Sequence, residues 1–184
     1  MNIATDTRTR DLVAQAAAWR MASLLLERPR PDWRDEIVGL SSEVIDARLL
    51  SAAKNADQAT EEKYHQLFGP GGTVSPREVS YCGFEDPGHV MAKLEAFYNA
   101  FVFKPGREEP IDHISVEAGF VGYLFLKEAY AEMRGDSDAV EITGNVRERF
   151  IKDHLGRSAR GMLERITELP AYLESALLWL AEQS

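Results

Sequence analysis

Residues 114–136, ISVEAGFVGYLFLKEAYAEMRGD, carry the strongest helical period in the chain. Their apolar side chains recur every three or four positions, which is the spacing of one face of an α-helix. The stripe that we expect to be buried consists of Ile114, Ala118, Val121, Phe125 and Ala129. The sequence RGDSD at 134–138 predicts the end of the helix, because glycine commonly follows a last helical turn. The pattern therefore predicts a central helix with one face in a core.

The same period continues on both sides of this segment, so the whole chain is predicted to be all-α. Apolar stripes and turn residues predict helices over residues 7–28, 32–55, 56–68, 90–102, 140–155, 158–169 and 170–183. Asp32 is the predicted N-cap of the second of these helices, which Gly39 could break. In the fourth, the expected stripe is Val90, Leu94, Phe97 and Phe101, with Met91, Tyr98 and Val102 alongside it. Since the sequence shows no facing pair of alternating strands and no repeat, we expect one helical domain over residues 1–184.

The composition limits the functions that this domain could have. With 184 residues, 45% hydrophobic and 28% charged, the chain is ordinary globular material. A formal net charge of -9 argues against general nucleic-acid binding, which requires lysine and arginine, and suits a basic peptide or protein patch. Cys82 is the only cysteine, which fits a reducing compartment. Asp11 and Arg20 interrupt the first apolar segment, so we expect no membrane span, no secretory signal and a cytoplasmic location.

The start of the central helix presents two proton-active groups, Asp112 and His113, just after Pro110. Glu109, His113 and Glu117 are four residues apart, so on one helix they would share a face and could bind a metal. Asp112 and His113 could instead be the acid/base pair of an enzyme, although no nucleophile or cofactor motif accompanies them. A structural interpretation places Asp112 at the positive end of the helix dipole and His113 at the surface. From the residues alone these alternatives stay open, as does a plain helical scaffold.

A second candidate feature is YHQLFGPGG, residues 64–72. Tyr64, Leu67 and Phe68 are three and four apart and project together from the end of a short helix. The Gly-Pro turn that follows cannot continue that helix. These side chains are either the core face of the helix or the floor of an apolar groove that receives a partner helix or peptide.

Together the two features resemble the TorD/DmsD/NarJ family of molybdoenzyme maturation chaperones. The resemblance rests on YHQLFGPG at 64–71, Pro76, EPIDHISVEAGF at 109–120 and FIKDHL at 150–155, and it covers roughly residues 58–155. It implies a cytoplasmic chaperone that is not an enzyme and has no cofactor of its own. Its fold would be the single TorD-like helical domain.

The resemblance also implies the partner, which is a molybdenum-containing oxidoreductase catalytic subunit. Such chaperones bind its twin-arginine signal peptide, assist molybdopterin insertion and hold the client back from export. A receptor of this kind needs carboxylates for guanidinium groups beside an apolar groove. The signal-peptide-binding residues that we expect are Tyr64, Leu67, Phe68, Gly69, Pro70, Pro76, Glu109, Pro110, Asp112, His113 and Glu117. The glycine and proline in residues 104–110 could form a hinge between two helical halves, giving a mostly monomeric protein with a minor domain-swapped dimer.

Overall fold

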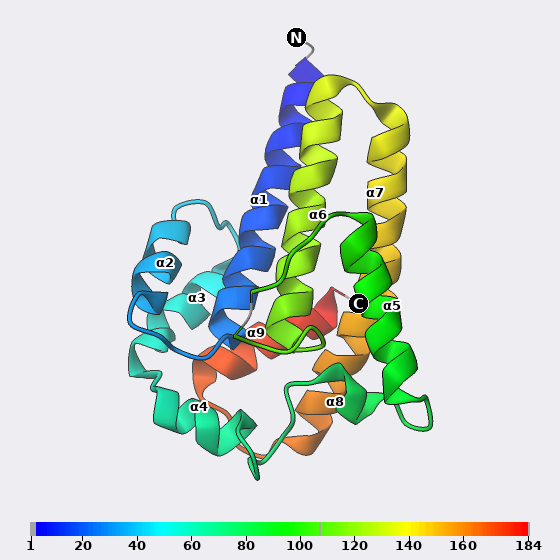
Figure 1. Cartoon of the computed structure of the whole chain (residues 1–184). Coiled ribbons are helices and arrows are strands. Elements are labelled where there is room, and N and C mark those ends of the chain that lie inside the picture. Colours follow the sequence, from blue (N-terminus) through cyan, green and yellow to red (C-terminus); the bar gives the residue numbers. More distant parts are fainter. Residues whose placement is uncertain (1–2, 107, 184) are drawn as a thin grey trace.

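The computed structural model describes residues 3–106 and 108–183 and confirms the all-α prediction (Figure 1). The elements in chain order are α1 Ile3–Leu26, α2 Trp33–Leu40, α3 Ala47–Asn55, η1 Ala56–Gln58, α4 Glu61–Phe68, η2 Glu78–Tyr81, α5 Pro87–Ala100, α6 Ile114–Arg134, α7 Ser137–Phe150, η3 Ile151–Leu155, α8 Gly156–Arg165 and α9 Ala171–Glu182. Within the described ranges no helix combines the length and the apolar character needed to cross a bilayer. An isolated bridge joins Arg77 to His113.

The centre of the molecule is the antiparallel pair of α1 and α6, which lie side by side along most of their length (Figure 1). All five residues of the predicted stripe in α6 are buried, as expected from their spacing. The helix ends at Gly135, whose φ of 69° lies in the left-handed region that glycine adopts without strain. The sequence pattern therefore predicted both the buried face of this helix and its end.

Close packing of α1 on α6 depends on Gly122, because a side chain there would meet the backbone of α1. A Cβ atom at this position would lie 3.3 Å from the carbonyl oxygen of Ala16 and 3.4 Å from the backbone nitrogen of Arg20. We expect Gly122→Ala to lower the free energy of unfolding by ~1–3 kcal/mol, the range for overpacking a core. Gly144→Ala in α7 is the matched control, since its Cβ would meet only the Glu128 side chain at an ordinary 3.6 Å.

The control should be stabilised by ~0.5–1 kcal/mol, because alanine is the better helix former. Urea unfolding followed by circular dichroism measures both changes. Equal stabilisation of the two variants would show that α1 and α6 separate easily.

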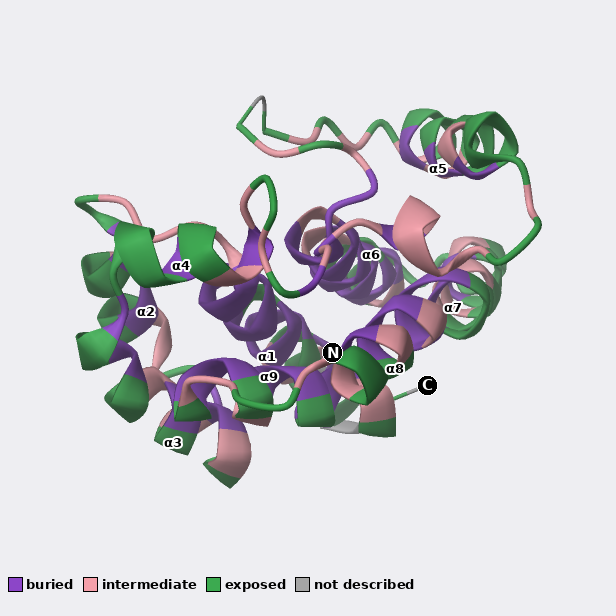
Figure 2. Cartoon of the chain, turned by 90° about the horizontal axis from the view of Figure 1, so that it is seen from below, coloured by how far each residue is buried: buried purple, intermediate pink, exposed green. Residues whose placement is uncertain are grey.

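The C-terminal helix α9 packs against α1 and α3, and many residues of α1 and α9 are coloured as buried in Figure 2. Trp19 of α1 packs edge-on against Trp179 of α9, with ring centroids 5.0 Å apart. The indole nitrogen of Trp179 donates to a carboxylate oxygen of Asp46 at 3.1 Å, and the other oxygen of Asp46 caps α3. One aspartate therefore joins the start of α3 to the end of the chain.

Several predicted helix boundaries are wrong. The helix predicted over 32–55 is two helices, α2 and α3, with the break after Leu40, next to the possible break predicted at Gly39. Asp32 stands at the cap position of α2 without a side-chain cap hydrogen bond. The helix predicted over 56–68 is likewise divided, because Thr60 adopts an extended conformation and caps α4. The two helices predicted over 140–155 and 158–169 are instead one continuous run, since the π-helical turn η3 carries α7 into α8.

The buried face of α5 also differs from its prediction. Val90, Leu94 and Tyr98 are buried, whereas Phe97 and Phe101 are only partly buried against the core. Val102 follows the helix with φ 58°, a conformation that is rare for a β-branched side chain. The chain then runs as a connector, residues 101–106 and 108–113, to the start of α6. The predicted hinge at 104–110 includes Arg107, which lies outside the described residues.

Candidate functional site

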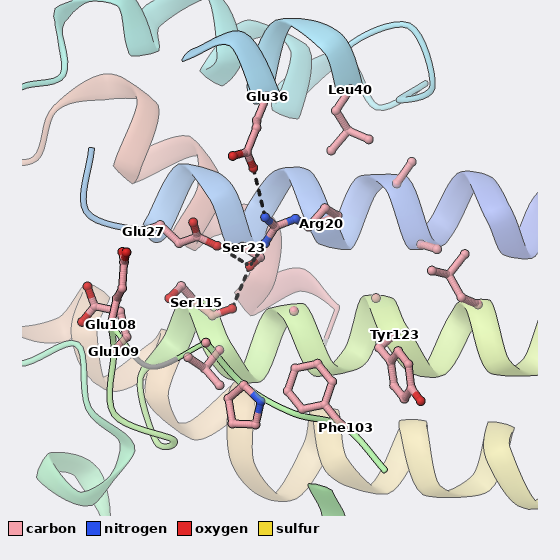
Figure 3. A pocket seen from close by; sticks show the side chains of 18 of the residues that line it. Arg20, Ser23, Glu27, Glu36, Leu40, Phe103, Glu108, Glu109, Ser115 and Tyr123 are labelled. Atoms are coloured by element: carbon pink, nitrogen blue, oxygen red, sulfur yellow. Dashed lines mark hydrogen bonds and ion pairs between the residues drawn. The ribbon is translucent and has the colours of Figure 1, made fainter. Parts of the chain in front are cut away.

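A groove of about 1270 Å³ runs along the seam between α1 and α6 (Figure 3). Residues of α2 line one side of it, and residues of the connector line the other. Small residues of the two central helices lie along the seam, namely Ala16, Ala17, Gly119 and Gly122. Because these positions carry little or no side chain, the two helices approach closely and leave the space above the seam open.

The groove has an acidic end and an apolar end. Glu27, Glu108 and Glu109 lie together at one end, while Tyr123 lies toward the other (Figure 3). Two further apolar lining residues, Val13 of α1 and Leu126 of α6, have exposed fractions of 41% and 50%. One end of the groove therefore holds carboxylates, with Arg28 and Arg30 also in its lining, and exposed apolar surface lies further along.

Two arginines pair with carboxylates at the acidic end. The Arg20 guanidinium of α1 lies 2.8 Å from Glu27 and 3.2 Å from Glu36 of α2. Arg30, in the turn before α2, is 2.5 Å from Glu36 and 3.7 Å from Glu27. The four side chains are all partly exposed, between 21% and 44%. Their charges cancel, and their contacts connect α1 to α2 across the groove.

Of the site residues predicted from the sequence, only Glu109 lines the described part of this groove. Burial raises the pKa of its carboxyl group, while the charge of Arg28 acts in the opposite direction. One of its oxygens lies 3.7 Å from Nε2 of His113. Glu109 therefore stands where the groove meets a buried polar network.

That network joins the two sequence motifs. His113 is buried and caps α6, where its Nδ1 accepts from the backbone N–H of Ser115 at 3.2 Å. The ring proton is then on Nε2, which donates to the Tyr64 hydroxyl oxygen at 2.9 Å. Burial above all, and then the nearby Arg77 charge, lower the pKa of His113 to about 3, so the imidazole is neutral. The interpretation of His113 as a surface residue is wrong.

Asp112 differs most from its expected environment, because its side chain is completely buried. Its carboxylate accepts a bifurcated hydrogen bond from the Nε–H of Arg77, with the two oxygens at 2.9 and 3.2 Å, and a longer hydrogen bond from the backbone N–H of Val79. It neither caps α6 nor reaches the groove. The carboxylate is not accessible in this structure, because the chain supplies its own arginine, and its part in binding a signal peptide stays a prediction.

The arrangement needed for metal binding by Glu109, His113 and Glu117 is absent. The helix begins at Ile114, so Glu109 lies in the connector and does not share a helix face with the other two. Glu117 is fully buried, and both of its side-chain oxygens are without a hydrogen-bond partner among the described residues. Residues 3–106 and 108–183 contain no group of three side chains placed to hold a metal ion.

A second buried carboxylate, Glu78, lies near Glu117 and is paired. His154 approaches it to 3.0 Å, and Arg157 forms an ion pair with it and with Glu85. His154 belongs to the FIKDHL motif, so this third motif also contributes to the interior.

The YHQLFGPGG motif supplies core packing and a tight turn. Tyr64 and Phe68 are buried edge-on against each other with centroids 5.0 Å apart, and Leu67 is partly buried. A Cβ atom at Gly69 would lie 2.5 Å from the carbonyl oxygen of His65, so the turn requires glycine there. The remaining predicted positions divide between the interior and the surface: Pro76 is buried, and Pro70 and Pro110 are exposed. Tyr64, Leu67 and Phe68 therefore form the core face of α4 and do not line the groove.

Sequence reasoning missed the residues that do line the groove, chiefly Arg20, Glu27, Glu36, Phe103 and Tyr123. In the sequence Arg20 only interrupts an apolar segment. A usable signal was present in the small residues of the first and central predicted helices, because paired small residues predict a close helix crossing with a shallow surface above it.

A family model for the nitrate reductase delta subunit matches residues 31–158. This span is well over half of the chain and includes α2, the connector, all of α6 and all of the motifs described above. Among curated proteins no match was found. The chain therefore belongs to the nitrate reductase delta subunit family, the NarJ/TorD-type chaperones of molybdoenzyme maturation.

Proposed function

We propose that the groove between α1, α2 and α6 binds the twin-arginine signal peptide of an apo-molybdoenzyme. The arginine pair would lie at the acidic end, and the apolar, helix-forming stretch of the peptide would follow the seam toward Leu126. The client is then a molybdenum-containing oxidoreductase catalytic subunit, held in the cytoplasm until molybdopterin is inserted. The chaperone itself catalyses no reaction in this proposal.

The order of chemistry along the groove supports this proposal most directly. A twin-arginine signal presents two guanidinium groups and then an apolar segment, and the groove presents carboxylates and then Tyr123, Val13 and Leu126. Arginine pairs with carboxylates through directional, often bidentate hydrogen bonds. Apolar helices bind in grooves through side chains at helical spacing. A matching order of the two kinds of contact also gives the peptide one direction.

The sequence-predicted motif residues would act on this site indirectly. Tyr64 and His113 hold the start of α6 and the end of the connector, and Glu109 is next to them at the groove. We propose that Glu109 contacts the peptide, whereas the buried motif residues position the wall that carries it.

The test is titration of the protein with a synthetic peptide that carries an arginine pair followed by an apolar stretch. We expect a dissociation constant of roughly micromolar strength, about -8 kcal/mol. Leu126→Glu should weaken binding at least about tenfold, the effect of ~1.4 kcal/mol, because it places a charge against the apolar segment of the peptide. Met133→Glu is the matched control, since it adds the same charge at an exposed apolar position of α6 that does not line the groove.

If Leu126→Glu and Met133→Glu lose the same affinity, the peptide does not bind in the groove. Peptides with glutamine in place of both arginines should bind more weakly than the arginine peptide. If they bind equally well, the acidic end plays no part in recognition.

A further inference from the structure

The acidic end of the groove is already occupied by the chain's own guanidinium groups. Arg20 reaches Glu27 on its own helix and Glu36 on α2, at 2.8 and 3.2 Å (Figure 3). We call this arrangement, Arg20 with Glu27 and Glu36, the arginine bridge. Arg30 contacts the same two carboxylates at 3.7 and 2.5 Å. An arginine of the bound peptide would therefore meet carboxylates that are already paired with arginines of the chain itself.

We propose that Arg20 is an internal competitor for the arginines of the bound peptide, and that it sets the affinity and the arginine selectivity of the groove. This inference rests on the proposed function, because it concerns the same groove. Arg20 would leave Glu27 and Glu36 as the peptide arrives, and a peptide guanidinium would take its place.

The exposure of the arginine bridge makes such an exchange inexpensive. The side chain of Arg20 is 44% exposed and that of Glu36 is 38% exposed. Ion pairs of this kind contribute little to stability, because water hydrates both partners when they separate. Ser23, which lies 3.3 Å from the Arg20 guanidinium, also donates to the backbone oxygen of Ser115 at 2.8 Å. The seam beneath the arginine bridge therefore keeps its own contact when Arg20 moves away.

Selectivity follows from the geometry of the two cations. A guanidinium group presents a planar fork of donors that can address two carboxylates at once, whereas a lysine ammonium acts as a compact point charge. A lysine peptide would therefore replace Arg20 poorly. With Arg20 in place, the groove should discriminate between arginine and lysine more strongly than it would without it.

The alternative is that Arg20 merely ties α2 to α1. The experiment compares Arg20→Gln with Arg28→Gln, using the arginine peptide and the same peptide with two lysines or two glutamines. Arg28 is the matched control, because it also lines the groove and removes one positive charge, but it pairs with Glu61 at 3.6 Å and not with the arginine bridge. Each variant removes one positive charge from the lining of the groove, so both make the local electrostatic potential more negative.

Arg20→Gln should bind the arginine peptide about three- to tenfold more tightly than wild type, the scale of one or two exposed ion pairs. The gain should exceed that of Arg28→Gln, should be absent with the glutamine peptide, and should be accompanied by weaker discrimination against the lysine peptide. Unchanged or weaker binding by Arg20→Gln, or a gain equal to that of Arg28→Gln, overturns the competitor role while leaving the proposed function intact. If wild type and both variants fail to bind the arginine peptide, the proposed function and this inference are both overturned.

Discussion

Glu117→Gln should abolish most of the loss of stability that we expect of the wild-type protein as the pH rises above about 6.5. Glu117 is fully buried in α6 without a hydrogen-bond partner for either oxygen among the described residues. Burial, and then the charges of Glu78 and Asp112, raise the pKa of its carboxyl group well above the ordinary value of 4.5. The carboxyl group therefore stays protonated in the folded chain at pH values where the unfolded chain has released the proton.

The sign of the effect follows from this difference in bound protons. Below pH 4.5 both states hold the proton and Glu117 contributes no pH dependence. Above it the folded state binds one more proton than the unfolded state, so stability falls by ~1.4 kcal/mol per pH unit until the folded pKa is reached. Glutamine is uncharged at every pH and has nearly the same shape, so the variant should lose this slope and be more stable than wild type at pH 8.

His113 produces the opposite slope on the acid side. Burial lowers the pKa of His113 to about 3 in the folded chain. As the pH falls below 6.5, the unfolded chain therefore binds a proton on this histidine and the folded chain does not. Stability is therefore fully present above pH 6.5 and is lost as the pH falls toward 3. In the wild type the slopes of His113 and Glu117 offset each other between pH 4.5 and 6.5, so the loss due to Glu117 is seen above pH 6.5. In Glu117→Gln only the slope due to His113 should remain, which separates the contributions of the two groups.

Urea unfolding between pH 5 and 8 measures the slopes directly. Glu95→Gln on α5 controls for the loss of one surface carboxyl, since Glu95 is exposed. Parallel curves for wild type and Glu117→Gln would contradict the prediction and show that the Glu117 carboxylate is ionised and hydrated inside the fold.

The parts of the fold that the sequence predicted correctly are those set by local periodicity. The stripe from Ile114 to Ala129 repeats at helical spacing and ends at a glycine, so both its buried face and its end follow from neighbours along the chain. The break between α2 and α3 is less visible, because Asp32 and Asp46 are equally good cap residues in sequence and only Asp46 makes the cap. The continuous run of α7, η3 and α8 depends on packing in the same way.

The environments of the charged residues could not be predicted, because they depend on partners far away in the sequence. Asp112 meets Arg77 from a loop 35 residues earlier, and Glu78 meets His154 from 76 residues later. Helical spacing gives no information about such pairs. The groove depends on the crossing of α1 over α6, so its acidic and apolar ends appear only when these helices are placed together.

Arg77→Ala is expected to destabilise the protein far more than Asp112→Asn, although both substitutions remove the same ion pair. Without Arg77 the buried Asp112 carboxylate loses its guanidinium partner and the bifurcated hydrogen bond from Nε. Breaking a buried pair by removing one partner costs ~3–5 kcal/mol, because the remaining charge is neither paired nor hydrated. Arg77 is 42% exposed, so water can reach the freed guanidinium when its partner is removed. Asp112→Asn should therefore cost only ~1 kcal/mol, the net value of a hydrogen bond.

The double variant tests this difference, because it also removes the unpaired charge that Arg77→Ala leaves on Asp112. Arg77→Ala with Asp112→Asn should be more stable than Arg77→Ala alone, which means that the second substitution partly repairs the first. Additive losses would show that Arg77 contributes through its packing and not through the carboxylate.

The same variants test whether Asp112 takes part in peptide binding. If Asp112 only pairs with Arg77, Asp112→Asn should lower the free energy of unfolding and leave the peptide affinity unchanged. A loss of affinity specific to the arginine peptide would instead mean that Asp112 exchanges Arg77 for an arginine of the client, and that the buried pair opens when the peptide binds.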